Sequence, residues 1–232
     1  MMDLERALQT TGAVREFADH PVPDEVVYHL LDVARYAPSG GNRQAWKAIL
    51  VKDPETRRRL RDQYLEGWYQ YLAMGAAGLV PWAPVTDRNA EARARQQAPN
   101  IAADAASGPG GFAEHLDTVP VLLVLLADLR GLAAVDRDLE RYTFVGGASI
   151  YPFTWSILLE AHNVGIGGVF TSMLALSESD VLKLLGAPDG WAVAGALVLG
   201  YPKDGKRPTR LRRAEVESFA TVDRFDGPPL SD

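Results

Sequence analysis

The chain has 232 residues, a formal net charge of -6 and no cysteine. This length predicts a single domain over residues 1–232 with a sizeable core, and the missing cysteine excludes disulfides, thiolate nucleophiles and zinc–sulfur sites. The acidic balance argues against nonspecific binding to nucleic acid, and no apolar run approaches the ~20 residues that span a bilayer. The N-terminus lacks the apolar stretch of a signal peptide, so we expect a cytoplasmic protein that binds neither nucleic acid nor membrane.

The chain begins with two predicted helices. Asp3 can cap a short helix that runs to about Gln9. Asp24 can cap a second helix, which ends before Pro38 because the residue ahead of a proline avoids the helical region. Arg15 lies between them beside a glycine turn. Its position fits either a contact with a ligand anion or an ordinary surface arginine.

The break after the second helix, residues 37–46, concentrates small residues, neutral amides and one large aromatic side chain. It holds neither an acid–base pair nor a cluster of metal ligands. Asparagine and glutamine can each donate and accept hydrogen bonds. The loop therefore suits a large, flat ligand with polar edges. A short strand over residues 47–51 follows it.

A third helix, with Thr56 as its expected N-cap, carries aromatic residues near one face, among them Tyr64, Trp68 and Tyr71. Such a stripe is more typical of a hydrophobic core than of a cofactor site. The arginines within residues 57–61 lie among acidic residues, which indicates a solvated helix face.

The apolar periodicity is lost between Gly75 and Gly111. The sequence there offers a polar helix over residues 88–97 and a flexible joint over residues 107–111. A long irregular segment inside a compact domain is usually functional or disordered. We interpret residues 75–111 as a lid inserted over the ligand site, with a disordered insertion as the alternative. His115, which follows, is expected to be structural.

The second half contains two apolar runs, residues 119–127 and 191–199, that predict fully buried strands. A long helix is expected over residues 146–162. The glycine-rich stretch at residues 165–173 only superficially suggests a dinucleotide fingerprint, since its sixth position is Phe170 and no strand precedes it. We interpret it as a turn that feeds a strand whose backbone approaches the ligand.

The C-terminal part opens with a basic cluster at residues 203–213. Arginine forks match phosphate oxygens, so the cluster is a candidate phosphate site, with a solvated tail as the alternative. Residues 214–232 include Phe219 and Phe225, which is too much aromatic surface for a frayed end. We expect them to form an arm that packs on a partner subunit.

The residues alone do not supply a reaction. The chain has no G-x-S-x-G elbow, no P-loop and no H-E-x-x-H motif. Its four histidines are scattered, and no metal site is predicted. If the protein is an enzyme, its chemistry comes from a cofactor that the protein binds, orients and tunes.

Several segments together resemble the FMN-dependent nitroreductase family. Their order and spacing agree with that family over nearly the whole chain, and residues 75–111 are the exception. The resemblance implies an α+β, nitroreductase-like fold with a central, mostly antiparallel sheet wrapped by helices. It also implies an intertwined homodimer with two FMN sites at its interface. The segments are Thr11–Phe17, Pro21–Pro23, Ala37–Trp46, Gly165–Phe170, Leu199–Pro202 and the C-terminal arginines.

The same resemblance assigns contacts to the flavin ring. Arg15 is expected near the pyrimidine edge and the ribityl chain. Phe170, Thr171 and Ser172 are expected to pass the isoalloxazine with a backbone N–H aimed at N5, so that no catalytic side chain is required. The loop after the second helix is expected to come from the other subunit. Its cofactor-binding positions are Pro38, Ser39, Gly40, Asn42 and Gln44.

The phosphate end departs from the family pattern. Arg210 is expected to meet the FMN phosphate, with Arg207 or Arg212 in support. The cofactor-binding positions Thr11, Gly12 and Ala13 stand where the family usually carries two arginines and a serine. We hypothesise that the C-terminal arginines compensate.

The function that the resemblance implies is ping-pong electron transfer from NADPH or NADH, through tightly bound FMN, to a small-molecule acceptor. The acceptor would be a nitroaromatic, a quinone or a similar electrophile. One alternative is a dehydrogenase or dehalogenase of the same fold with a dedicated substrate. Another is a flavin-binding protein without turnover.

Overall fold

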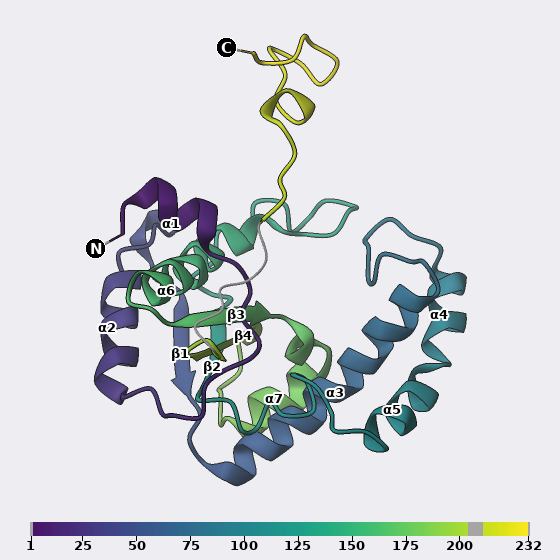
Figure 1. Cartoon of the computed structure of the whole chain (residues 1–232). Coiled ribbons are helices and arrows are strands. Elements are labelled where there is room, and N and C mark those ends of the chain that lie inside the picture. Colours follow the sequence, from purple (N-terminus) through teal and green to yellow (C-terminus); the bar gives the residue numbers. More distant parts are fainter. Residues whose placement is uncertain (1, 204–210, 232) are drawn as a thin grey trace.

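A four-stranded antiparallel sheet with helices on both faces forms the body of the protein (Figure 1). The structure is a computed structural model that describes residues 2–203 and 211–231. It confirms the expected α+β fold. No helix among the described residues is long and apolar enough to cross a membrane.

The sheet has the strand order β1-β2-β4-β3. Its strands are β1 (Trp46–Leu50), β2 (Val121–Asp128), β3 (Gly167–Thr171) and β4 (Trp191–Gly200). The two central strands, β2 and β4, are almost entirely buried, as their apolar runs predicted. In the register, Ala48 lies opposite Leu125 and Val169 lies opposite Val198. Because β3 pairs with one strand only, one of its edges is open to other partners.

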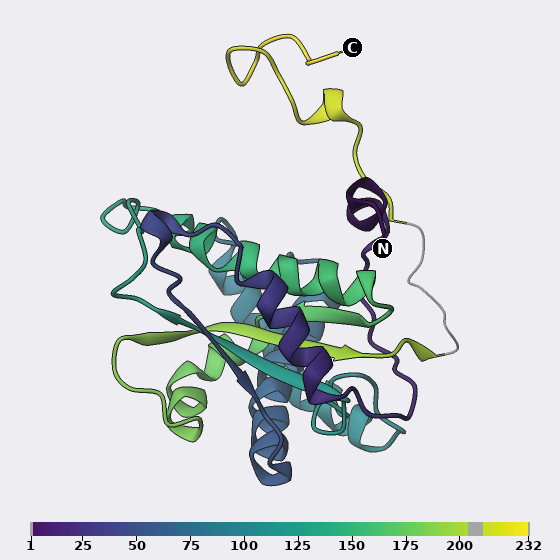
Figure 2. The same ribbon diagram turned by 90° about the vertical axis from the view of Figure 1, so that its left-hand side faces the viewer.

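Alternate side chains of β2 enter two separate cores. Leu123 and Leu125 pack against the face covered by α2 (Asp24–Ala34) and α6 (Tyr151–Asn163). Leu122 and Val124 pack against the face covered by α3 (Pro54–Ala76) and α7 (Glu178–Leu184). Figure 2 shows α2 and α6 on one side of the sheet, with α3 and α7 on the other. This alternation follows from the two-residue period of a strand.

The helices begin near the predicted positions, but the capping residue is not always the predicted one. α1 (Leu4–Thr10) is capped by Asp3, whose Oδ1 accepts a hydrogen bond from the Arg6 amide at 3.0 Å. Asp24 was the predicted N-cap of α2, but it is the first residue of the helix, and Pro23 is the N-cap. α3 is capped by Asp53, and Thr56 lies in its first turn.

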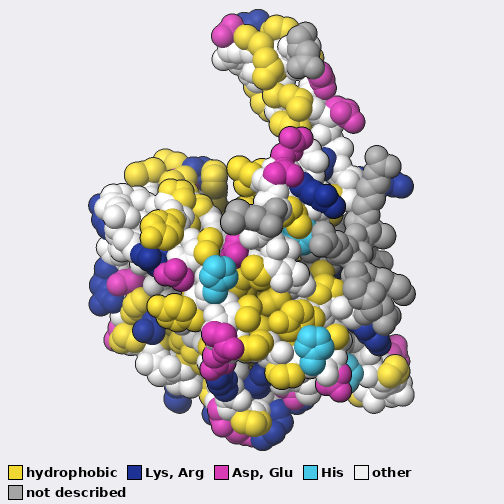
Figure 3. All heavy atoms as spheres, turned by 60° about the vertical axis from the view of Figure 1, so that its left-hand side comes forward, with side chains coloured by type: hydrophobic (Ala, Val, Ile, Leu, Met, Phe, Trp, Pro, Cys, Tyr) yellow, Lys and Arg dark blue, Asp and Glu magenta, His cyan; other side chains and the backbone are white. Residues whose placement is uncertain are grey.

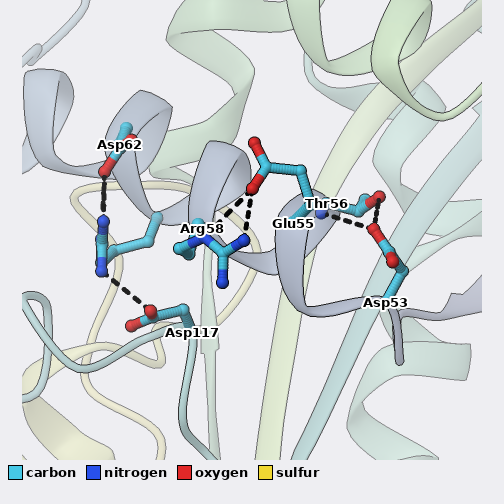
Figure 4. A network of polar contacts seen from close by, with 7 residues as sticks. Asp53, Glu55, Thr56, Arg58, Asp62 and Asp117 are labelled. Atoms are coloured by element: carbon cyan, nitrogen blue, oxygen red, sulfur yellow. Dashed lines mark hydrogen bonds and ion pairs between the residues drawn. The ribbon is translucent and has the colours of Figure 1, made fainter.

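The contacts around the start of α3 show why Thr56 was the wrong cap (Figure 4). Asp53 Oδ2 accepts hydrogen bonds from both the backbone amide and the hydroxyl of Thr56, each at 2.8 Å. Pro54 then fits the first turn because it lacks an N–H that would need a partner. Nearby, Arg61 bridges Asp62 and Asp117, and Arg57 donates to the Val119 carbonyl, so the helix face expected to be solvated is partly buried.

The polar helix predicted over residues 88–97 is confirmed, and the rest of residues 75–111 is less irregular than expected. α3 continues to Ala76, and two further helices follow, α4 (Arg88–Arg95) and α5 (Ala98–Ala106). Asp87 caps α4 by accepting hydrogen bonds from the amides of residues 89 and 90. Both helices lie alongside α3, on its side away from the sheet (Figure 1).

The single long helix expected over residues 146–162 is two elements. A short 3-10 turn, η2 (Val145–Ser149), precedes α6, which starts at Tyr151. Pro152 lies in the first turn of α6. Proline cannot donate the hydrogen bond that a continuous helix would require at that point. The remaining short turns are η1 (Gly40–Asn42), η3 (Met173–Ser177) and η5 (Val216–Ser218).

Candidate functional site

The open edge of β3 is met by the segment that leads to Arg15. The Val14 amide donates to the Gly168 carbonyl at 2.9 Å, and Ala13 forms a parallel bridge with Gly168. A side chain at Gly167 would come within 2.6 Å of a Val14 methyl carbon. The glycines of residues 165–168 therefore let two backbones cross closely. They are not a dinucleotide fingerprint.

A cavity of about 230 Å³ lies between α3 and the end of β3, and we call it the Arg15 cavity. Arg15 and the three consecutive residues Phe170, Thr171 and Ser172 all line it. The structure thus brings together four residues that the resemblance assigned to one ligand. Arg15 is exposed, and in the described part of the chain its side chain has no hydrogen bond or ion pair.

The backbone of β3 offers free hydrogen-bonding groups to this cavity. Outward and inward groups alternate along a strand, and the Gly168 carbonyl points outward to Val14. Two residues further on, the N–H and C=O of Phe170 therefore also point to the open edge. The segment that ends at Arg15 has already left the strand there. The N–H that points outward is therefore that of Phe170, the first of the three residues whose backbone was expected to face the ligand.

Tyr64 forms the floor of the Arg15 cavity and is only 1% exposed. Its hydroxyl oxygen accepts a hydrogen bond from Thr171 Oγ1 at 3.2 Å. Burial raises the pKa of Tyr64, while the Thr171 contact and the charge of Arg15 oppose that rise. The phenol is consequently neutral at physiological pH, and it fixes the Thr171 side chain at the cavity wall.

Aromatic rings form the outer wall of the cavity. Trp68 stacks on Tyr64 with ring centroids 6.2 Å apart and on Tyr71 at 5.4 Å, and Tyr71 stacks on Trp82 at 6.4 Å. Trp82 has a φ of 52°, which is rare for so bulky a residue. The stripe on α3 belongs to the core, as interpreted from sequence, and it also lines the candidate site. The sequence feature that could have indicated a cavity is the large size of Tyr64, Trp68 and Tyr71, which are four and three residues apart on one helix face.

The loop at residues 38–44 is preformed and exposed. The Gln44 amide donates to Ser39 Oγ at 3.0 Å, and Gln44 Nε2 donates to Asn42 Oδ1 at 3.2 Å. Asn42 and Gln44 both have positive φ, 55° and 51°. Such conformations persist only where the surroundings hold them, and they often mark functional positions. None of the residues 38–44 lines the Arg15 cavity.

Asp136 ties together the segment that supports this loop. Its carboxylate, 3% exposed, accepts hydrogen bonds from the Thr143 hydroxyl, the Phe144 and Val145 amides and the Arg141 guanidinium. Burial alone would raise the pKa of Asp136, but these donors more than offset it and hold the pKa well below the ordinary range.

The tie at Asp136 fixes the start of η2. At the other end of η2, Ser149 Oγ accepts from the Gly40 amide at 3.0 Å. A side chain at Gly40 would meet both Ala133 and Ser149 at 3.4 Å. The loop at residues 38–44 therefore packs between the residues that precede Asp136 and the end of η2.

The expected phosphate end is only partly described. Thr11 Oγ1 donates to the Ala7 carbonyl at 2.7 Å, so its hydroxyl serves the end of α1. Gly12 lines a narrow cleft beside Gly165 and Pro202. Arg207 and Arg210 lie outside the described residues, and Arg212 is exposed.

Within the described residues, no group of three or more acidic or histidine side chains could hold a metal ion. His115 has the structural contact expected of it, because its Nε2 lies 2.8 Å from the Pro109 carbonyl. That contact and the bond from the Gly111 amide to Glu114 Oε2, at 2.7 Å, hold the expected flexible joint in place.

Comparison with known proteins identifies the group to which this arrangement belongs. A model of the nitroreductase family matches residues 10–201, from just before the Thr11 motif to the end of β4. The chain belongs to the nitroreductase family. This family membership places it among the flavoprotein oxidoreductases.

Two similar sequences show the range within this nitroreductase family. An NADH dehydrogenase from Thermus thermophilus is 26% identical over 209 residues, covering 90% of this chain and 91% of that protein. Iodotyrosine deiodinase 1 from Rattus norvegicus is 28% identical over 213 residues, covering 91% of this chain and 66% of that protein. The chain thus spans about two thirds of the deiodinase.

Two solved structures share the nitroreductase fold with this chain. A BluB-like flavoprotein from Clostridium difficile 630 has a TM-score of 0.67 at 17% identity, covering 97% of this chain and 100% of that one. An iodotyrosine deiodinase bound to FMN and 3-iodo-L-tyrosine has a TM-score of 0.60 at 21% identity, covering 92% and 96%.

Proposed function

We propose that this protein is an FMN-dependent oxidoreductase that takes electrons from NADPH or NADH and passes them to a flat, electrophilic small molecule such as a nitroaromatic or a quinone. The observation that carries the proposal is the juxtaposition of Arg15 with the open edge of β3 in one cavity. Bound FMN would accept two electrons from one molecule and deliver them to another.

The residues of the Arg15 cavity fit the ring system of FMN. The outward N–H of Phe170 can donate to a ring nitrogen, and Arg15 supplies an unpaired positive charge for the oxygen-rich pyrimidine edge. Positive charge and a donor at those positions stabilise an anionic, reduced ring. Trp68 and Tyr71 provide apolar faces for a planar molecule.

The loop at residues 38–44 supports a two-subunit site. Its amide groups suit the polar edge of a flavin, yet it lies away from the Arg15 cavity of its own chain. We assign it to the cavity of a partner in a homodimer. Figure 3 shows hydrophobic side chains over the face that carries α1 and α2 and along the projecting C-terminal segment. Tyr28 and Tyr36 are exposed on that face, 72% and 76%, and would be covered by a partner.

The aromatic wall favours a ring-shaped acceptor. Trp68 and Tyr71 line the cavity, and their rings offer π surface that binds planar molecules through offset stacking. A halogenated phenol would use the same surface. The likeness to a deiodinase makes reductive dehalogenation the second reaction to assay.

The absorption spectrum of the purified protein tests the proposal. We expect a flavin spectrum that bleaches when NADH or NADPH is added without oxygen, and that returns when a nitroaromatic, a quinone or a halophenol is added. A protein that stays colourless after incubation with FMN would contradict the cofactor. A flavin that neither donor bleaches would contradict the reaction and favour a flavin-binding protein without turnover.

A variant links this result to the Arg15 cavity. Loss of a hydrogen bond to a charged group costs about 1.5–3 kcal/mol, so Arg15→Gln should weaken FMN binding by roughly 10- to 150-fold. Arg6→Gln is the matched control, because Arg6 is an exposed arginine of α1 outside the cavity. Equal flavin affinity in the two variants would remove Arg15 from the site.

A further inference from the structure

A second hollow adjoins the Arg15 cavity and shares Arg15 and Phe112 with it. It has a volume of about 540 Å³ and lies between residues 17–21 and the loop that precedes β2. We call it the His20 cavity. Its size falls within the range typical of sites for small organic ligands. It therefore needs an occupant of its own.

The two cavities are neighbours. Arg15 and Phe112 line both of them and form the boundary between the two spaces. A molecule with one end on the flavin would reach the His20 cavity by passing Arg15. A nicotinamide dinucleotide has this extended shape, with the reactive ring at one end and adenosine at the other.

The lining of the His20 cavity suits a purine ring. Phe17, Phe112, His20 and His115 line it, and bases stack on such rings without needing a unique geometry. One face of the His20 ring already lies on Tyr201, with ring centroids 4.3 Å apart. The Pro109 carbonyl can only accept a hydrogen bond, so the Nε2 of His115 that meets it carries the proton.

The charges in the His20 cavity suit a phosphate and a ribose. Arg15 lines this cavity as well as the flavin site, and its five N–H donors can serve the diphosphate in addition to the pyrimidine edge of the flavin. Asp19 is the carboxylate in the lining. A carboxylate beside the adenosine ribose accepts hydrogen bonds from its hydroxyls in other dinucleotide sites, and it repels a 2′-phosphate.

We propose that the His20 cavity binds the adenosine monophosphate half of the nicotinamide donor, and that Asp19 makes NADH the preferred donor over NADPH. This assignment rests on the proposed function, since it needs a nicotinamide donor at the flavin. It adds a binding site for the donor and a basis for its selectivity.

Calorimetric titration of the FMN-loaded protein tests the site directly. We expect AMP to bind at least about tenfold more tightly than inorganic phosphate, which corresponds to one extra stacked or hydrogen-bonded ring. The ligand 2′,5′-ADP should bind at least about tenfold more weakly than AMP. Ala18→Trp, which fills the cavity, should abolish AMP binding, and Asp19→Asn should bring the two affinities together.

The control variant is Asp180→Asn, because Asp180 is exposed on α7, outside the cavity and on the side of the sheet opposite α2. It should leave both affinities as in the wild type. AMP that binds no more tightly than phosphate, or that binds equally well to Ala18→Trp, would overturn the site. An unchanged ratio of the two affinities in Asp19→Asn would overturn the role of Asp19.

A measurement on the unaltered protein covers the case in which Ala18→Trp fails to fold. Reduced nicotinamide mononucleotide carries the same reactive ring as NADH but lacks adenosine monophosphate. We expect a tighter dissociation constant for NADH than for the mononucleotide when flavin bleaching is titrated, and equal constants would overturn the proposal. If neither compound bleaches the flavin, the proposed function fails, and AMP calorimetry still reports on the cavity.

Discussion

Asp136 acts on its surroundings as an ionised acceptor. The carboxylate accepts hydrogen bonds from a hydroxyl, a guanidinium and two backbone amides, so all four neighbours act as donors toward it. A neutral amide side chain of the same shape would point a donor at one of them. The charge of Asp136 is therefore part of the structure that holds the loop at residues 38–44.

This role predicts a specific dependence of stability on pH. The folded state lowers the pKa of Asp136, so its contribution is fully present above the unfolded pKa of about 4 and is lost as pH falls through the lower folded pKa. Asp136→Asn should lower the melting temperature at pH 7, and the loss of stability below about pH 4 should be shallower than in the wild type.

Thermal melts from pH 7 to pH 3 would measure this difference. Asp138→Asn is the control, because Asp138 is exposed and pairs only with the exposed Arg137. If the curve for Asp136→Asn runs parallel to that of the wild type across this range, the ionised carboxylate does not carry the effect.

At the scale of elements, the crossing of β3 by the segment before Arg15 depends on two glycines. A side chain at Gly168 would lie 2.4 Å from a Leu199 methyl group and 2.5 Å from the Val198 carbonyl oxygen. The leucine could rotate, but the carbonyl belongs to the neighbouring strand. The backbone of β3 would have to move, and the Arg15 cavity with it.

Gly168→Ala should therefore destabilise the protein by about 1–3 kcal/mol, the usual cost of overpacking a core, and should weaken flavin binding as well. Gly75→Ala is the matched control, since an added carbon there meets nothing within 4 Å in helix α3. It should be stabilising by about 0.5–1 kcal/mol. Urea unfolding of both variants measures the difference, and a neutral Gly168→Ala would show that β3 is not tightly packed against β4.

The elements also show what the sequence could predict. The strands β2 and β4 followed from apolar runs that no surface segment would carry. A polar helix was predicted over residues 88–97, where α4 lies, whereas α5 was missed because it is short, rich in alanine and buries no side chain. Their stability comes from packing along α3, which is a tertiary effect that local pattern does not reveal.

The candidate site was predictable where motifs carried it. Arg15 and Phe170 were found through the resemblance, and the structure places both in one cavity. Trp68 was not found, because helical periodicity identifies a buried face without telling whether the face meets a core or a hollow. The His20 cavity was not predicted either, since Asp19 and His115 are far apart in the sequence and meet only in the fold.

For the whole molecule, the proposed homodimer makes cofactor binding depend on protein concentration. The loop at residues 38–44 and the arm at residues 214–232 are both exposed in the single chain, and Phe225 has no covered surface. If a partner covers the arm and receives the loop, separating the subunits removes part of each flavin site. Dilution below the dimer dissociation constant should then release FMN.

Sedimentation at the flavin wavelength would follow both events together. Asn42→Ala should weaken FMN binding by roughly 3- to 12-fold, the equivalent of one hydrogen bond of about 0.5–1.5 kcal/mol. Asn100→Ala, on the exposed side of α5, is the control. Flavin that stays bound while the dimer separates would show that each chain holds its cofactor alone.

The tie at Asp136 also bears on how such a protein can change over evolutionary time. Residues 143–145 come back to Asp136 and donate hydrogen bonds to its carboxylate. The exposed residues 137–140 therefore form a closed side loop whose ends are fixed. Lengthening a loop costs little, about 0.6 kcal/mol for each doubling. Insertions there would leave the support of Gly40 in place. The side loop ends near Tyr142, which receives a hydrogen bond from Arg88 of α4. An insertion in the side loop could thus form new contacts with α4 without disturbing the support of the loop at residues 38–44.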